Sequence, residues 1–212
     1  MLVPIRDVDE SIKEIKRAAK IGAAAVMLQG MAWDKLLGDE SLFPFFQIAA
    51  DLNLPVCVHL GWGCPALTRI FDATTNFYSA ILPVVMGFNS IMSSAAFEKI
   101  ANLRFSFIEA GAALLPFIIK QVRRAILRRK LAKDPIEYFT TGRVFVSAEP
   151  DEDLTGIAAL VGEDSFVLGS DYPHGDPSRQ EDMVAEFRER KDLSQTMVEK
   201  MLSDNPKRLY GF

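Results

Sequence analysis

The stretch FVLGSDYPHGD, residues 166–176, guides the interpretation of the whole chain. Its first residues form a short apolar run without polar alternation, which is typical of a strand buried on both faces. The run leads directly into Asp171. In parallel α/β proteins the active site forms at the carboxyl ends of the strands, so a carboxylate at this place indicates function.

Apolar runs of the same kind recur along the chain, with helical patterns between them. The clearest is the first helix, which has Asp7 and Glu10 at capping-box spacing at its start. Strands that alternate with helices predict a parallel sheet with right-handed crossovers. The other predicted strands are 2–5, 25–29, 55–59, 104–109 and 143–147, and the later helical patterns are 41–53, 93–102, 114–133, 151–162 and 178–191.

Composition limits the class of protein. With 212 residues, 49% hydrophobic and 25% charged, residues 1–212 are expected to form one soluble domain. The net charge of −4 gives no basic footprint for nucleic acid. No apolar run approaches the roughly 18 residues of a membrane helix. Two cysteines without a CxxC pair or a secretory signal favour the cytoplasm.

Two architectures fit an alternation of strands and helices: a doubly wound open sheet and a (β/α)8 TIM-type barrel. No GxGxxG motif follows any predicted strand, and the sequence has no GxxxxGK[ST] phosphate loop. These absences disfavour a nucleotide-binding domain.

Functional side chains gather at the predicted strand ends. Gln29, His59, Glu109 and Asp171 end strands or follow them, and His174, the second of the two histidines, comes just after Asp171. One imidazole with two carboxylates suits Zn²⁺, Mn²⁺ or Fe²⁺. Such an ion would acidify a bound water, and Asp171 could carry the proton. The alternative is structural, since a strand-end side chain can also cap a helix or bond a backbone amide.

Three further residues are candidates for a substrate pocket. Trp62 and Arg69 follow His59 in a long predicted loop, where they could wall the pocket or pack beneath the loop. Arg69 could pair with a substrate carboxylate or with an acidic neighbour. His174 is a candidate because it lies so close to Asp171.

At these residues the chain resembles the amidohydrolase superfamily. The matching branch consists of amidohydrolase-related metal-dependent hydrolases and includes aminocarboxymuconate-semialdehyde and related aromatic-acid decarboxylases. The resemblance covers nearly the whole chain. It rests on LNLPVCVHLGWG at 52–63, NLRFSFIEAGAALLPFII at 102–119, VFVSAEPDEDL at 144–154, FVLGSDYPHGD at 166–176 and MLSDNPKRLYGF at 201–212.

The resemblance implies a (β/α)8 barrel that holds one divalent metal, most simply Zn²⁺, at its carboxyl face. His59 would be the metal histidine of the fifth strand, and Asp171 the aspartate of the eighth strand, which binds metal and moves protons. Glu109 would stand where many members carry a sixth-strand histidine.

The amino terminus departs from the family pattern, because the sequence contains no HxH pair. Counting back from residues 166–171, about six of eight strands are expected, with the first two βα units missing. The remaining ligands His59, Asp171 and Glu109 would then bind metal weakly or not at all. Open sheet edges would also favour a homo-oligomer.

Three functions remain open. The first is a metal-dependent hydrolase that acts on a small carboxylated or cyclic substrate. The second is a non-oxidative decarboxylase of the same family, because both reactions stabilise negative charge on oxygen and deliver a proton. The third is a catalytically inactive, truncated barrel that serves as an oligomeric interaction module.

Overall fold

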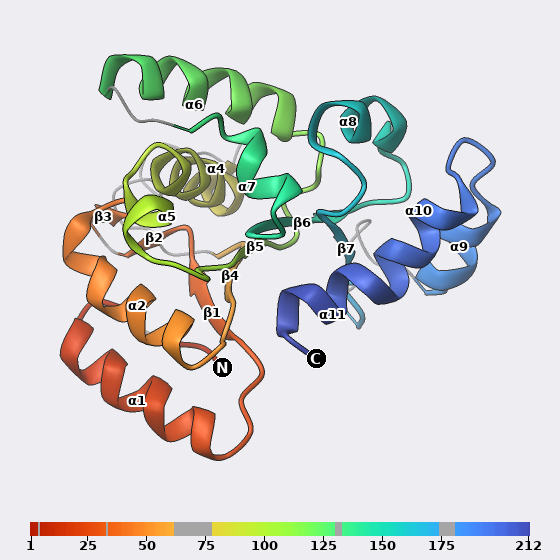
Figure 1. Ribbon diagram of the computed structural model, residues 1–212. Coiled ribbons are helices and arrows are strands. Elements are labelled where there is room, and N and C mark those ends of the chain that lie inside the picture. The colour runs from red at the N-terminus through yellow and green to blue at the C-terminus, as the bar shows by residue number, and fades with distance from the viewer. Residues whose placement is uncertain (4, 33, 62–77, 130–132, 174–180) are drawn as a thin grey trace.

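A parallel sheet lies at the centre of the computed structural model, which describes residues 1–3, 5–32, 34–61, 78–129, 133–173 and 181–212 (Figure 1). Every pairing in this five-stranded sheet is parallel. In spatial order the strands are β1 (Val26–Gln29), β4 (Val56–His59), β5 (Phe105–Phe107), β6 (Val144–Ala148) and β7 (Phe166–Leu168).

The strand order decides between the two architectures. The spatial order of the strands across the sheet is the same as their order along the chain, without reversal. A doubly wound sheet reverses its order at a switch point, whereas a (β/α) barrel does not. The prediction of an α/β fold of the barrel type is therefore confirmed.

The strand predicted at residues 2–5 is only partly formed. Leu2 makes a single parallel bridge to Met27, and the amide of Val3 donates to the Met27 carbonyl at 3.2 Å. The chain then turns toward Asp7, which caps the first helix by accepting the N–H of Glu10 at 3.1 Å. The early turn shortens this strand to one bridge.

Helices cover the sheet, and α1 and α2 lie side by side along the β1 end (Figure 1). The bounds of the helices up to the middle of the chain are α1 (Val8–Lys20), η1 (Glu40–Leu42), α2 (Phe43–Asp51), α4 (Tyr78–Met92), α5 (Ala96–Lys99) and α6 (Leu115–Arg129). Those that follow are α7 (Ile136–Thr140), α8 (Leu154–Val161), α9 (Met183–Glu189), α10 (Gln195–Glu199), the π-helical turn η2 (Lys200–Asp204) and α11 (Asn205–Tyr210).

Helix α4 and a small antiparallel hairpin were not predicted. The hairpin consists of β2 (Met31–Ala32) and β3 (Lys35–Leu36), and α4 packs against both strands. The sequence of α4 is apolar nearly throughout and contains Pro83, so it shows neither an amphipathic period nor an uninterrupted helical pattern.

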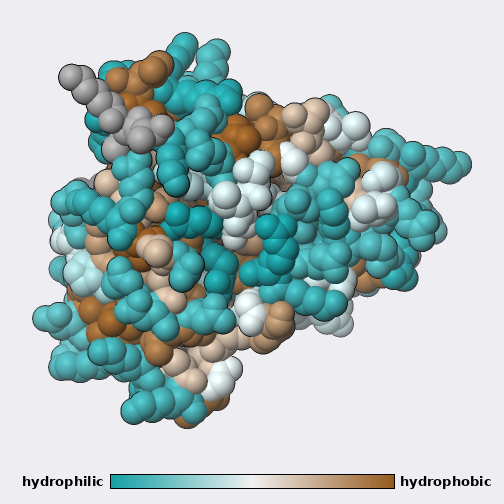
Figure 2. Space-filling view, in the orientation of Figure 1, coloured by the Kyte–Doolittle hydropathy of each residue, from teal (hydrophilic) through white to brown (hydrophobic). Residues whose placement is uncertain are grey.

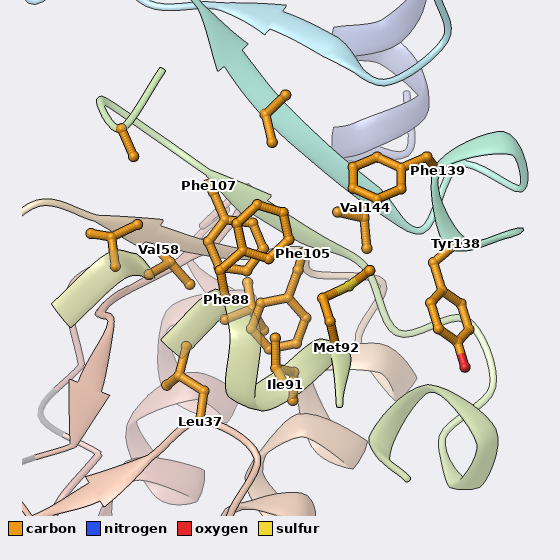
Figure 3. Packing of buried hydrophobic residues seen from close by; sticks show 14 of the residues in the cluster. Leu37, Val58, Phe88, Ile91, Met92, Phe105, Phe107, Tyr138, Phe139 and Val144 are labelled. Carbon is orange, nitrogen blue, oxygen red and sulfur yellow. The ribbon is translucent and has the colours of Figure 1, made fainter. Parts of the chain in front are cut away.

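Aromatic packing connects α4 to the middle of the sheet (Figure 3). Phe88 of α4 stacks on Phe107 of β5, with the ring centroids 3.6 Å apart and the planes at 9°. Phe105 meets Phe46 and Phe97 edge-on at 5.3 and 5.9 Å. Large buried rings contribute strongly to core stability, so β5 is firmly held just before Glu109.

Polar side chains cover most of the visible surface, and apolar groups lie between them in several places (Figure 2). Among the described helices, none is both long enough and apolar enough to cross a bilayer.

Candidate active site at the carboxyl edge of the sheet

The predicted functional side chains meet at one edge of the sheet. His59 ends β4 and Gln29 ends β1, and the two residues are in register on adjacent parallel strands. The Gln29 side chain lies against Gly61, where an added Cβ would come within 2.5 Å of its Nε2. Glu109 follows β5, and Asp171 follows β7. Parallel strands bring their carboxyl ends to the same edge, which explains the gathering.

His59 and Glu109 form an ion-pair contact at this edge. His59 Nε2 lies 3.0 Å from Glu109 Oε2, and the side chains are 30% and 23% exposed. His59 Nδ1 lies 2.7 Å from the carbonyl oxygen of Leu60. A carbonyl can only accept, so Nδ1 carries a proton and donates it. Nε2 then faces the Glu109 carboxyl.

Asp171 also interacts with Glu109. Burial raises the pKa of the Glu109 carboxyl, and a side-chain hydrogen bond with Asp171 raises it further, while the nearby His59 charge opposes the shift. The raised pKa favours the protonated form of Glu109. We call His59, Glu109 and Asp171 the acid–base cluster.

The backbone is unusual at both acids of the acid–base cluster. Glu109 has φ 59° and Asp171 has φ 51°, in the left-handed region, which is uncommon for glutamate and more readily adopted by aspartate. The amide of Glu109 donates to Ser147 Oγ of β6 at 2.9 Å. Backbone strain of this kind persists only where the surroundings impose it, and it concentrates at functional sites.

A cavity of about 500 Å³ opens beside Glu109, and its lining includes Ile81, Leu114, Glu149 and Glu152. Burial raises the pKa of Glu149, and the charges of Glu152, Asp151, Asp171 and Glu109 add to the shift. Sequence reasoning missed Glu149 and Glu152. Glu149 directly follows β6, so the strand-end signal that singled out Glu109 could have found it as well.

The three residues predicted as metal ligands lie at the same edge of the sheet, and their role as ligands stays a prediction. Within the described residues, no three His, Cys, Asp or Glu side chains are arranged to hold an ion. His59 Nδ1 is bonded to Leu60, and Nε2 faces Glu109.

The remaining predicted site residues fall in parts of the chain that the structure does not describe. Trp62 and Arg69 belong to residues 62–77, and His174 belongs to residues 174–180. Their proposed places in a substrate pocket stay predictions.

Comparison with known proteins gives a family match along the entire chain. The family model described as amidohydrolase matches residues 1–212. A curated relative is 2-amino-3-carboxymuconate-6-semialdehyde decarboxylase of Dictyostelium discoideum, which is 24% identical over 221 residues. The alignment covers 99% of this chain and 59% of that relative, so the chain spans less than two thirds of the relative's length.

Solved structures of similar fold cover nearly the whole chain. The amidohydrolase map2389c of Mycobacterium avium subsp. paratuberculosis K-10 superposes with a TM-score of 0.86 at 23% identity, over 100% of this chain and 57% of that one. The dihydroxybenzoic acid decarboxylase of Polaromonas sp. JS666, with bound manganese and 2-nitroresorcinol, gives 0.78 at 17% identity, over 99% and 67%. The 5-carboxyvanillate decarboxylase of Novosphingobium aromaticivorans DSM 12444, with bound manganese, gives 0.82 at 17% identity, over 100% and 64%. At these identities the similarity establishes the fold.

Proposed function

Because this chain belongs to the amidohydrolase family, we propose that it catalyses the non-oxidative decarboxylation of a small unsaturated or aromatic carboxylic acid. The observation that carries the proposal is the acid–base cluster, in which Glu109 interacts with both His59 and Asp171 at the carboxyl edge of the sheet. The relatives named as decarboxylases support the choice of reaction.

The acid–base cluster suits the proton-transfer half of this reaction. When the bond between carbon and carboxylate breaks, CO₂ leaves and the electron pair stays on carbon, which must then take a proton. Glu109 can deliver that proton, and Asp171 favours its protonated form. The partly exposed His59 can return a proton from solvent. A positioned acid of this kind accelerates a reaction by roughly 10²–10⁴-fold.

A divalent metal is part of the proposal. When bound, such an ion would stabilise negative charge on a substrate oxygen. Zn²⁺ is the ion that the sequence favours, but two of the similar structures contain manganese, so Mn²⁺ should be tested first. The described residues alone do not complete a metal site, and we therefore assign the ion no ligand set.

Hydrolysis is the second candidate, favoured by the pairing of His59 with Glu109 at 3.0 Å. The pair could take a proton from water and so direct the water at a small carboxylated or cyclic substrate. In either case we propose a small-molecule ligand without nucleic-acid or membrane partners, and a cytoplasmic location. The net charge of −4 and the presence of only two cysteines support this part.

Isotope-labelled water separates the two reactions. The chain is incubated with a panel of small carboxylic acids in D₂¹⁸O, without metal and with Mn²⁺ or Zn²⁺, and the products are analysed by mass spectrometry. Decarboxylation gives a product that has lost CO₂ and gained one deuteron, whereas hydrolysis introduces ¹⁸O.

Two variants are measured beside the native chain: Asp171→Asn, which should lower the rate, and Glu137→Gln on α7, which should not. If the folded chain converts no substrate under any condition, the proposal is contradicted and the interaction module is favoured.

A further inference from the structure

A carboxylate outside the acid–base cluster ties together the two loops that surround Glu109. Glu152 lies in the loop after β6, and both of its oxygens accept backbone N–H groups. Oε2 accepts from Ala112 at 3.0 Å and from Glu149 at 2.9 Å. Oε1 accepts from Ala113 at 2.6 Å. One side chain thus binds amides of the loop after β5 and of its own loop.

The bonded amides follow Glu109 closely in the chain. Gly111 lies between Glu109 and Ala112 in the chain. Its φ is 69°, and a Cβ added there would come within 2.6 Å of Glu152 Oε1. Only glycine accommodates both this conformation and this contact. On the other side of the loop, Ser147 of β6 accepts the amide of Glu109 itself. The β5 loop is therefore anchored at Glu109 and again just beyond it.

Placing Glu152 here has an electrostatic cost. Burial is the main cause of the raised pKa of Glu149, and the charge of Glu152 is the next. Charge-assisted bonds from three backbone amides offset the cost, because hydrogen bonds to a charged group are stronger than those between neutral groups.

We propose that Glu152 is a positioning residue, which fixes the β5 loop to the β6 loop and thereby holds Glu109 against His59. The inference rests on the proposed role of the acid–base cluster. The geometric claim can nevertheless be tested without turnover, so its failure can be distinguished from a failure of the proposed reaction.

The imidazole ¹⁵N spectrum is the readout, because the chain contains only two histidines. The signals of His59 are assigned by their loss in His59→Ala. They are compared at one pH among the native chain, Glu152→Gln and Asp151→Asn. Asp151→Asn is the matched control, because it removes the same charge from the same loop and Asp151 is not the acceptor of these three amides. Hydrogen exchange at Ala112 and Ala113 is recorded in the same samples.

In Glu152→Gln we expect the His59 Nε2 signal to move and the two amides to exchange about tenfold faster or more. Asp151→Asn should resemble the native chain in both respects. The proposal is overturned if the amides exchange faster while the His59 signals stay in place. Glu152 would then anchor the loop without holding Glu109 against His59. It is also overturned if Asp151→Asn moves the His59 signals equally.

Two further measurements guard against a variant that does not fold. Glu152→Asp keeps the charge but shortens the reach by one methylene, so it should reproduce the effects of Glu152→Gln. In the native chain itself, the amides of Ala112, Ala113 and Glu149 should be protected from exchange, and rapid exchange there would contradict the proposal.

Discussion

At the residue scale, the carboxyl group of Glu149 is partly buried and has four acidic neighbours. Both conditions disfavour its charged form and raise the pKa of Glu149. The folded chain then holds this proton more tightly than the unfolded chain, whose Glu has a pKa of about 4.3. Ionisation of Glu149 therefore costs stability above its folded pKa, and the cost vanishes below the unfolded pKa.

We predict that Glu149→Gln raises the free energy of unfolding at pH 8 and changes it little at pH 4. Urea unfolding at the two pH values measures the effect. Glu137→Gln, at an exposed position on α7, serves as the control for removing a negative charge. An equal change at both pH values would show that the Glu149 charge is not the cause.

Much of the candidate site could be predicted residue by residue. His59, Glu109 and Asp171 were found because each ends or follows an apolar run, and parallel strands bring such residues to one edge. Ser147 and Glu152 could not be found in this way. Their bonds join positions about 40 residues apart, and such pairings depend on how the two loops pack.

At the scale of elements, two glycines let α4 approach the segment after β1. A Cβ on Gly87 would lie 2.1 Å from the carbonyl oxygen of Gly30, and one on Gly30 would lie 2.0 Å from that of Pro83. Real Cβ atoms do not come so close to backbone atoms. Gly87 is needed for this approach and not for any special helical conformation.

We predict that Gly87→Ala lowers the free energy of unfolding by about 2 kcal/mol, in the usual range for overpacking. In an open helix the same change would stabilise by about 1 kcal/mol, so the sign of the result is decisive. Gly169→Ala is the control, because nothing lies within 4 Å of its added Cβ. Urea unfolding of both variants supplies the comparison, and a stabilised Gly87→Ala would refute the close approach.

The five strands of the sheet could be predicted from the sequence, whereas helix α4 and the β2–β3 hairpin could not. Short apolar runs identified β1 and β4 to β7, because most of the residues in these strands are buried. The chain turns at Ile5 and Arg6, and the strand predicted at residues 2–5 makes a single bridge. Helix α4 was missed because it lacks a polar face, and the hairpin because each strand has only two residues.

At the scale of the whole molecule, the described sheet is open, with β1 and its bridge to Leu2 at one edge and β7 at the other. Several large apolar side chains are exposed: Leu2 at 66%, Phe117 at 57% and Leu127 at 79%. Unpaired strand edges and exposed apolar groups favour association.

We predict that the chain forms homo-oligomers at micromolar concentration. Size-exclusion chromatography with light scattering should give a mass of at least twice 23.6 kDa. A Leu127→Glu variant tests whether α6 takes part, since a charge there should shift the mass downward if it does. A monomeric mass across the micromolar range would refute self-association.

The acid–base cluster is the centre of this account, and the rate of CO₂ release tests it most directly. The native chain, Glu109→Gln and the control Glu137→Gln are compared on the substrate panel with Mn²⁺ present. We predict release by the native chain and by Glu137→Gln, with Glu109→Gln slower by roughly 10²–10⁴-fold. Release by Glu109→Gln at the native rate would contradict the account.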